Sequence, residues 1–426
     1  MGCKLNFSET STIAREFEAG DFVRARKGEA ADIYVVNTCS VTEHADKKCR
    51  NLIRRITKEN QEAIVAVTGC YAQLKPHDIA AIEGVDLVIG NNDKGSVFER
   101  IAALSGKKAG VSAHSCEVSE LTGFFSAFSS GDRTRAFLKV QDGCDYRCAY
   151  CTVPLARGAS RNIPTGEIVA QAGHIASQGQ REIVITGINT GDFGRTTGES
   201  FPDLLRALDR VEGISRYRIS SIEPNLLTDE IIEFTAASQK FQPHFHIPLQ
   251  SGSNRILGLM GRRYNAKKFA DRIEAARRLM PCTFFGIDVI VGFPGETEED
   301  FMDTYRLLES VRPAFLHVFP YSVRANTPAA GFESKVPPPV AADRVKRLME
   351  LSGVLHNEFY SKYTGTDAEV LWESTRRGSD MSGYTGNYIK VRAPFDRNLI
   401  NKITGVRLGA PNNDGTVDAA ITGAWT

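Results

Sequence analysis

Apolar residues in the first hundred positions fall into short runs separated by amphipathic stretches. Runs at residues 32–37, 63–68 and 85–90 have the length and β-branched content of buried strands. One of the amphipathic stretches is predicted to be a helix that begins with Ser8 as its N-cap and ends at Gly20. Strands that alternate with helices predict an open parallel sheet.

A longer alternation of strands and helices begins near Arg135 and continues to about residue 361. The predicted strands are residues 136–140, 182–186, 216–222, 244–249, 284–291 and 315–321. The predicted helices lie near residues 165–178, 202–211, 228–239, 265–279, 297–310 and 341–361. Six strand–helix units predict a partial parallel (β/α)6 barrel, with functional groups at the carboxyl ends of the strands.

The last part of the chain has a shorter period. Strands are predicted at residues 367–372, 384–391, 398–408 and 417–423, between turns rich in Gly, Asn and Pro, which favours a small antiparallel β-barrel. Residues 106–131 are rich in Gly, Ser, Lys and Glu and are predicted to be a linker. The expected fold class is α/β, with an N-terminal domain (1–105), the linker (106–131), a central barrel (132–361) and a C-terminal barrel (362–426).

Composition narrows the class of protein. A chain of 426 residues with 42% hydrophobic and 24% charged content can bury two or three ordinary cores. It has no apolar run of membrane-spanning length and no signal peptide, so we expect a cytoplasmic protein without a membrane partner. The net charge of +1 means that a nucleic-acid partner would have to be met by local basic patches.

The nine cysteines indicate metal chemistry. Their odd number and the absence of an export signal make disulfides improbable. Cys144, Cys148 and Cys151 stand at the spacing C-x3-C-x2-C, directly after a predicted strand. Three sulfurs are one short of the four that close a zinc site or saturate an iron–sulfur cluster. This loop therefore predicts a metal with one position left open for a substrate or cofactor.

A second set of three cysteines lies in the N-terminal domain. Cys39 and Cys70 follow predicted strands at the edge where open α/β sheets bind ligands. Cys3 would lie there too if a strand preceded it, and we expect relatives to have such a strand. One cysteine alone would be an ordinary buried residue, but three at one structural position favour a shared metal site. Cys49 belongs to the apolar face of a helix, and Cys116 has no partner at metal spacing.

The helix that contains Cys49 has a basic opposite face. Its members are Lys47, Lys48, Arg50, Arg54, Arg55 and Lys58. A solvated face and a contact with a polyanion are both open interpretations.

The cysteine loop, with an aromatic residue at Tyr150, resembles the signature of the radical S-adenosylmethionine enzymes. With the second cysteine set and a small C-terminal domain, almost the whole chain resembles the methylthiotransferase family. Gly-Cys-Lys-Leu-Asn at 2–6, Val-Gln-Asp-Gly-Cys at 140–144 and Pro-Leu-Ala-Arg-Gly at 154–158 resemble the subfamily that acts on threonylcarbamoyl-adenosine of transfer RNA. The isopentenyl-adenosine subfamily usually has Gln-Met-Asn after its first cysteine, and the ribosomal-protein aspartate subfamily has Pro-Lys-Asn.

The resemblance implies two 4Fe–4S clusters and S-adenosylmethionine as cofactors. Cys144, Cys148 and Cys151 would hold the cluster whose open iron chelates S-adenosylmethionine, and reductive cleavage would yield a 5′-deoxyadenosyl radical. The cluster on Cys3, Cys39 and Cys70 would deliver sulfur to carbon 2 of the adenine, and a second S-adenosylmethionine would methylate it. The implied neighbours of S-adenosylmethionine are Tyr150, Glu223, Gln250, Ser251 and Arg263.

The partners follow from the same resemblance. The substrate would be adenosine 37 in the anticodon loop of transfer RNA, and an electron donor such as flavodoxin or ferredoxin would be needed. No stable protein partner is evident. The C-terminal barrel would be a TRAM-like RNA-binding module, in which basic residues meet phosphates and Tyr384 and Tyr388 meet bases. Isopentenyl-adenosine and a ribosomal-protein aspartate stay open as substrates, and a non-catalytic metal-containing RNA-binding protein is the alternative of another class.

Overall fold

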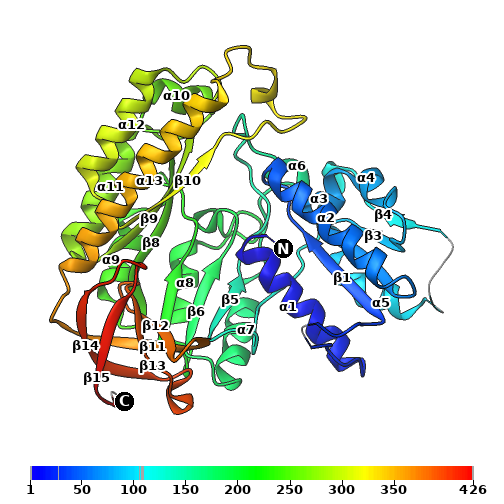
Figure 1. Cartoon of the computed structure of the whole chain (residues 1–426), viewed down its shortest axis with the longest axis horizontal. Coiled ribbons are helices and arrows are strands. Elements are labelled where there is room, and N and C mark those ends of the chain that lie inside the picture. The colour runs from blue at the N-terminus through cyan, green and yellow to red at the C-terminus, as the bar shows by residue number, and fades with distance from the viewer. Residues whose placement is uncertain (1, 27, 105, 107–109, 425–426) are drawn as a thin grey trace.

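The computed structural model describes residues 2–26, 28–104, 106 and 110–424 and shows three β-sheets in succession along the chain (Figure 1). A four-stranded parallel sheet is followed by a six-stranded parallel sheet and by a closed five-stranded barrel. The N-terminal domain lies to one side of the central sheet, and the C-terminal barrel lies below it in the view of Figure 1. The predicted fold class is confirmed.

The N-terminal sheet has the strand order β1 (Ile33–Thr38), β2 (Ile64–Gly69), β3 (Leu87–Ile89), β4 (Ser112–His114), all parallel. Separate apolar clusters form on its two faces. One includes Cys49 and Ile53 of α2 (Glu43–Glu59), and the other includes Ile13 of α1 (Lys4–Ala19) and Val97 of α5 (Val97–Ala102). The short helices α3 (Cys70–Leu74) and α4 (Pro76–Ala80) follow β2.

Two local predictions for this domain were wrong. Helix α1 begins at Lys4, and Ser8 lies inside it with its hydroxyl donating to the carbonyl of Leu5 (2.8 Å) rather than capping the helix. The segment 106–131 is not only a linker, because it contributes β4 and a turn of 3-10 helix at Val118–Glu120. A three-residue strand is too short to produce a recognisable apolar run, and its ladder with β3 depends on the tertiary fold.

The central sheet has the order β10-β9-β8-β7-β6-β5 with every neighbouring pair parallel, and β5 and β10 form its open edges. Its strands are β5 (Arg135–Lys139), β6 (Glu182–Thr186), β7 (Arg216–Ile219), β8 (Phe241–Gln250), β9 (Phe284–Val291) and β10 (Phe315–Pro320). Its main helices are α7 (Thr165–Ser177), α8 (Phe201–Asp209), α9 (Asp229–Ala237), α11 (Ala266–Leu279), α12 (Glu298–Val311) and α13 (Pro338–Ser361). This is the predicted partial barrel.

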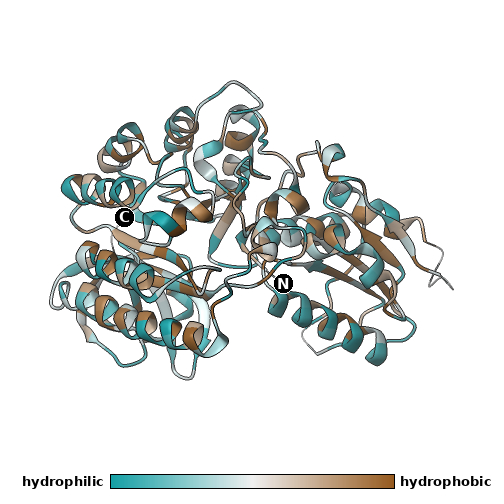
Figure 2. Ribbon diagram, turned by 90° about the horizontal axis from the view of Figure 1, so that it is seen from above, coloured by the Kyte–Doolittle hydropathy of each residue, from teal (hydrophilic) through white to brown (hydrophobic). Residues whose placement is uncertain are grey.

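The helices cover one face of the central sheet, and the main core lies between them. Figure 2 shows largely apolar strands surrounded by helices that carry both apolar and polar residues. Alternate strand residues such as Tyr217, Phe245 and Phe285 point into this core. The residues between them point to the interior of the barrel, and many of these are polar or charged. Helices α6 (Val153–Arg157) and α10 (Asn254–Leu259) were not predicted, because five or six residues show no clear period.

The C-terminal barrel closes in the order β11-β12-β13-β15-β14 around Trp372 and other buried apolar residues. Its strands are β11 (Asp367–Arg377), β12 (Asp380–Thr385), β13 (Lys390–Pro394), β14 (Ile403–Pro411) and β15 (Val417–Ala424). All pairs are antiparallel except β13–β15. The strand predicted at 384–391 is divided by a turn in which Tyr388 has a φ of 65°, so this prediction was wrong.

Arginines of β5 and β7 hold the C-terminal barrel against the lower end of the central sheet. Arg135 donates to the hydroxyl of Tyr388 (2.9 Å), and Arg218 donates to the carbonyls of Thr385 and Gly386. The ring of Tyr384 lies 4.3 Å from the Arg135 guanidinium. Tyr384 and Tyr388, expected to meet RNA bases, therefore pack in this contact between domains.

Candidate active site

The cysteine loop after β5 is shaped by its backbone. Asp142 and Arg161 exchange two backbone hydrogen bonds of 2.9 Å, which holds the start of the loop against the segment after α6. Gly143 has a φ of 69°, and a Cβ there would stand 1.9 Å from the carbonyl oxygen of Ala159, so only glycine fits. The loop is therefore tight, and Cys144 is placed by a further bond from its N–H to the carbonyl of Gly158 (3.1 Å).

Each of the three loop sulfurs accepts one hydrogen bond. The donors are the N–H of Tyr146 to Cys144 (3.3 Å), the N–H of Val153 to Cys151 (3.4 Å) and Nη1 of Arg262 to Cys148 (3.1 Å). Hydrogen bonds to cysteine sulfurs are among the features that stabilise iron–sulfur clusters and tune their potential. The donor set therefore fits a cluster held by three thiolates.

Burial makes these sulfurs poor free thiolates. Together with the neighbouring Cys148, it raises the pKa of Cys144 and Cys151 to about 12. Burial also raises the pKa of Cys148, partly offset by Arg262. Such thiols are protonated at neutral pH on their own and ionise when a metal ligates them.

The second cysteine set gathers at the carboxyl edge of the N-terminal sheet. Cys39 follows β1, Cys70 begins α3 directly after β2, and Cys3 is the N-cap of α1. Burial, together with the nearby Cys70 and Cys3 thiols, raises the pKa of Cys39 to about 12. A Cβ on Gly2 would stand 2.9 Å from the Cβ of Cys39, so the residue before Cys3 also lies against this edge.

The other cysteines of the N-terminal half lie outside this set, as the sequence predicted. Cys49 is fully buried in the apolar cluster under α2. Its sulfur lies 3.6 Å from the carbonyl oxygen of Cys39, so it packs against the backbone of the second cysteine set. Cys116 is half-buried in the segment that follows β4.

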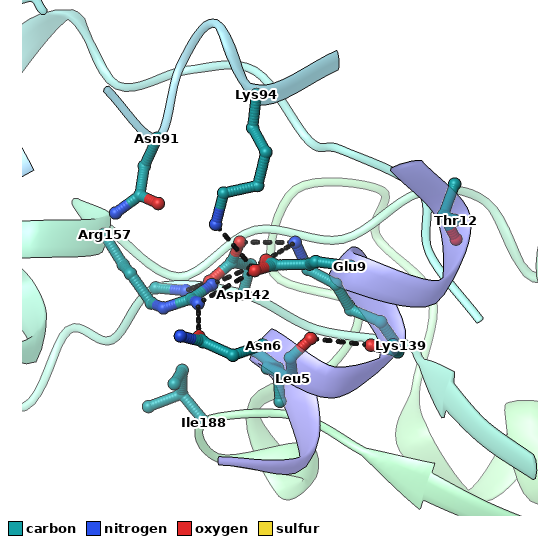
Figure 3. A network of polar contacts seen from close by, with 12 residues as sticks. Leu5, Asn6, Glu9, Thr12, Asn91, Lys94, Lys139, Asp142, Arg157 and Ile188 are labelled. Carbon is teal, nitrogen blue, oxygen red and sulfur yellow. Dashed lines mark hydrogen bonds and ion pairs between the residues drawn. The ribbon is translucent and has the colours of Figure 1, made fainter. Parts of the chain in front are cut away.

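The two cysteine sets are joined by the polar network that Figure 3 shows, with Glu9 of α1 at its centre. The Glu9 carboxylate contacts Lys94 Nζ (2.6 Å), Lys139 Nζ (3.0 Å) and Arg157 Nη1 (3.0 Å). Asp142 pairs with the same Lys139 (2.6 Å) and Arg157 (2.9 Å). All five side chains are buried, so they fix α1 and its Cys3 relative to the loop that follows β5.

The charges of this network face the second cysteine set. Burial alone would raise the pKa of Glu9, but Arg157, Lys94 and Lys139 hold it well below its usual value. Burial raises the pKa of Cys3, and Arg157 partly offsets it. Arg161, also buried, pairs with Asp142 (3.7 Å), so two carboxylates stand against four buried cations and two positive charges are in excess, which suits an anionic group bound at these cysteines.

A direct contact brings the two sets still closer in space. Thr152, the residue after Cys151, lies with its hydroxyl 3.4 Å from the carbonyl oxygen of Ser40, the residue after Cys39. Arg324, which follows β10, donates to the hydroxyl of Ser40 (2.7 Å) and pairs with Asp46 (2.8 Å). The structure thus places the cysteine loop of the barrel opposite the cysteine edge of the N-terminal sheet.

Of the residues expected near S-adenosylmethionine, Tyr150 and Glu223 lie beside the cysteine loop. Both contact Arg262, whose guanidinium forms an ion pair with Glu223 and lies 3.4 Å from the Tyr150 hydroxyl. Burial raises the pKa of Glu223, and Arg262 opposes this. Arg262 therefore connects Cys148 to both residues.

The other three expected residues are arranged differently. Gln250 ends β8 with a φ of 64°, in the left-handed region. Ser251 is buried, and its hydroxyl lies 3.3 Å from that of Thr304. Arg263 is exposed and donates to the carbonyl of Asp145 (2.8 Å), with its guanidinium 4.1 Å from the Tyr146 ring. Arg263 thus supports the outside of the loop, whereas its neighbour Arg262 points inward.

Sequence reasoning missed Arg262 and the network around Glu9. Arg262 and Arg263 are consecutive, and only the turn after α10 decides which one points inward. Lys139 alternates with apolar residues that face the helices, so it occupies an interior position of β5. This period-2 alternation is the signal that could have identified it.

Comparison with known families identifies the family of this chain. A family model for the Radical SAM superfamily matches residues 138–308, and one described as Uncharacterized protein family UPF0004 matches residues 1–90. The threonylcarbamoyladenosine tRNA methylthiotransferase MtaB of Bacillus subtilis (strain 168) is 41% identical over 97% of this chain and 94% of its own length. The chain belongs to the radical S-adenosylmethionine methylthiotransferase family.

More distant members show the same near full-length match. The protein of the same name from Aquifex aeolicus (strain VF5) is 35% identical over 92% of this chain and 95% of its own. The tRNA-2-methylthio-N(6)-dimethylallyladenosine synthase of Wolinella succinogenes is 36% identical over 96% of this chain and 95% of its own. This methylthiotransferase therefore has relatives named for two different adenosine substrates.

Solved structures support the fold. The radical S-adenosylmethionine methyltransferase TsrM of Kitasatospora setae, with cobalamin and a [4Fe-4S] cluster bound, superposes with a TM-score of 0.54 at 14% identity. The match covers 76% of this chain and 69% of that protein. Membership of the radical S-adenosylmethionine superfamily implies S-adenosylmethionine and a 4Fe–4S cluster as cofactors of this enzyme. In the part of the chain that the structure describes, no helix is long and apolar enough to cross a membrane.

Proposed function

We propose that this methylthiotransferase modifies carbon 2 of N6-threonylcarbamoyladenosine at position 37 of transfer RNA. The observation that carries the proposal is the meeting of the two cysteine sets across the Thr152–Ser40 contact. The family shares this chemistry, and relatives with 34–41% identity over nearly the full chain are named for the threonylcarbamoyl substrate. The product is the 2-methylthio derivative.

The two sets divide the work. Cys144, Cys148 and Cys151 would hold the cluster that binds S-adenosylmethionine, and Cys3, Cys39 and Cys70 would hold a second 4Fe–4S cluster at the sulfur-donating site. When bound, these cofactors would supply the radical chemistry and the sulfur for exchanging hydrogen for sulfur at the adenine. The chain's own contribution is to hold the base between the two sets and to exclude water from it.

The binding of S-adenosylmethionine involves the residues around the cysteine loop. Tyr150 and Glu223 lie beside the cysteine loop, and Gln250 and Ser251 lie at the end of β8. The family resemblance implies that all four contact S-adenosylmethionine. Arg262 takes the place that the sequence suggested for Arg263, because its guanidinium contacts Cys148 and Glu223 while Arg263 lies outside the loop. A buried arginine side chain beside Cys148 suits a carboxylate ligand.

Transfer RNA requires a basic surface beyond the site. The exposed face of α2 carries Lys47, Lys48, Arg54 and Arg55 beside the Cys39 edge, and the C-terminal barrel, as a TRAM-like module, adds exposed Arg397, Lys402 and Arg407. Both are suited to phosphates. A flavodoxin or ferredoxin supplies the electron, and the enzyme acts in the cytoplasm, where transfer RNA is found.

The test is a comparison of transfer RNA nucleosides from a deletion strain and its parent by mass spectrometry. We expect the 2-methylthio-threonylcarbamoyl nucleoside to disappear and the unmethylthiolated threonylcarbamoyl nucleoside to accumulate. Return of the product on expression of this chain, but not of its Cys148→Ala variant, ties the loss to the radical site.

Other outcomes of this experiment point to the alternatives. Loss of the methylthio-isopentenyl nucleoside with the threonylcarbamoyl product intact would assign the enzyme to the other adenosine substrate. If both nucleosides persist, a ribosomal-protein aspartate is the remaining substrate of the family. Purified protein that holds zinc and does not cleave S-adenosylmethionine would instead support the non-catalytic RNA-binding alternative.

A further inference from the structure

A row of polar side chains crosses the interior face of the central sheet and takes no part in the contacts described so far. It comprises Ser220, directly after β7, His246 of β8, Asp288 of β9 and His317 of β10. Their strand neighbours Ile219, Phe245, Ile287 and Leu316 face the helices and form the main core. The row therefore faces the interior of the partial barrel.

The members of this row lie close together. His246 Nε2 is 2.7 Å from Asp288 Oδ1, and the rings of His246 and His317 are 5.2 Å apart. Gly286 lies between the two histidines, since a Cβ there would stand 3.7 Å from His317 and 3.9 Å from His246. The side chains of His246 and Asp288 are 20% and 22% exposed, and His317 is exposed, so the row can be reached from solvent.

Lys4 enters the same space from the N-terminal domain. Its ammonium donates to the hydroxyl of Ser220 (2.8 Å), which places the first residue of α1 over the end of β7. Within the described residues it has no ion-pair partner, although an ammonium offers three donors. Lys4 follows Cys3 directly, so the row begins beside the sulfur-donating site.

The same end of the row approaches the radical site. Glu223 lies three residues after Ser220 and pairs with Arg262, and Arg262 donates to Cys148. The row of polar side chains therefore lies between the two cysteine sets, where the proposed function requires the substrate base.

We propose that Lys4, with the row His246–Asp288–His317, binds the N6-threonylcarbamoyl group of the substrate. This inference rests on the proposed function. Carbon 2 and N6 lie on the same edge of adenine, so a base placed between the cysteine sets directs its N6 substituent at this row. Lys4 binds the threonyl carboxylate, His317 supports it, and the Asp288–His246 pair contacts the hydroxyl and ureido groups.

The same residues reject a hydrocarbon substituent. A dimethylallyl group offers no hydrogen-bonding atom, so it would displace water from the Lys4 ammonium and from His317 and leave the ammonium without a counter-charge. Sites built to hydrogen-bond a substrate discriminate strongly against an analogue that lacks the bonding group. The row thus separates the two adenosine substrates for which relatives of this chain are named.

The test measures binding rather than turnover. Reconstituted enzyme with S-adenosylhomocysteine is titrated with labelled anticodon stem–loop RNAs that carry adenosine, threonylcarbamoyladenosine or its methyl ester at position 37. We expect wild-type enzyme to bind the acid more tightly than either the ester or adenosine, by about 10- to 100-fold. Lys4→Gln should lose this preference and leave the affinity for the adenosine RNA unchanged.

Because Lys4 adjoins Cys3, iron content is measured for each variant, and His246→Gln provides a second, independent change. Lys48→Gln on the exposed face of α2 is the matched control, and it should weaken the binding of all three RNAs by the same factor. The effects of Lys4→Gln and of esterifying the threonyl carboxylate should not add. The variant should therefore bind the ester RNA no more weakly than either single change predicts. Additive losses, or a zinc ion bound by His246, Asp288 and His317, would refute the inference.

Two further outcomes separate this inference from the proposed function. Wild-type enzyme that prefers the threonylcarbamoyl RNA while Lys4→Gln keeps that preference contradicts the role of Lys4 alone. A fourth RNA with dimethylallyladenosine at position 37 is titrated with wild-type enzyme. If the enzyme prefers this RNA, or shows no preference among the RNAs, the proposed function is contradicted and the inference falls with it.

Discussion

At the residue scale, neighbouring arginines with the same chemistry have different tasks. Arg262 is buried against Cys148 and Glu223, whereas Arg263 is exposed and holds the carbonyl of Asp145. The family resemblance pointed to Arg263 because sequence motifs carry no information about side-chain direction. The turn at Gly261, with a φ of 70°, is what directs Arg262 toward the cysteine loop.

This difference predicts unequal effects on S-adenosylmethionine cleavage. Arg262→Gln removes the hydrogen bond to Cys148 and leaves Glu223 without its cation, so 5′-deoxyadenosine formation should fall about 10- to 100-fold. Arg263→Gln should change it less than about threefold, since its contacts lie outside the loop. The measurement is anaerobic reductive cleavage by liquid chromatography. A larger loss in Arg263→Gln than in Arg262→Gln would contradict our assignment.

At the element scale, α1 connects the two domains. Its first residues lie beside Cys39 and Ser220, and Glu9 reaches the buried cations of β5 and α6 (Figure 3). Buried ionic networks rarely add much net stability, but removing one member leaves the others buried without a partner. The network therefore acts as a specific fastening between the domains.

We predict that Glu9→Gln destabilises the protein by about 3–5 kcal/mol, because Lys94 and Lys139 lose a buried counter-charge. Glu18→Gln on the exposed side of the same helix removes a solvent-exposed pair with Arg24 and should cost less than about 1 kcal/mol. Urea unfolding of both variants measures the difference. Equal effects of the two changes would show that the buried network does not hold α1.

At the scale of the whole molecule, three sheets converge on one site. The cysteine loop stands at the carboxyl edge of the central sheet, the N-terminal sheet presents its own cysteines to that loop, and the C-terminal barrel closes the opposite end through Arg135 and Arg218. The proposed reaction needs both cysteine sets, so it depends on how the domains pack together.

This arrangement predicts separable losses. Cys148→Ala should abolish 5′-deoxyadenosine formation, whereas Cys70→Ala should leave it largely intact and remove sulfur insertion into RNA. Each variant should retain about half of the roughly eight irons expected for two clusters, and Cys116→Ser, the control, should retain them all. Iron analysis with both activity assays measures this. Equal loss of both activities in Cys70→Ala would argue against separate clusters.

Much of the fold and of the candidate site could be predicted from the sequence, because local patterns indicate them. The alternation of β-branched runs with amphipathic helices indicated both parallel sheets, and the bounds of β6 and β9 were predicted correctly. The spacing of Cys144, Cys148 and Cys151 marked the candidate radical loop, since three ligands to one cluster would have to lie close along a tight turn. The family of the enzyme followed from these short-range signals.

Tertiary structure decided the features that depend on contacts distant in sequence. Lys4 and Ser220 are 216 positions apart, and Glu9 and Arg157 are 148 apart. No local period brings such residues together, because their distance depends on how the domains pack. The sequence determined the fold class and placed two sets of three cysteines at the carboxyl ends of strands, because both follow from local patterns. The packing of α1 against the barrel decided which side chains stand between the two cysteine sets.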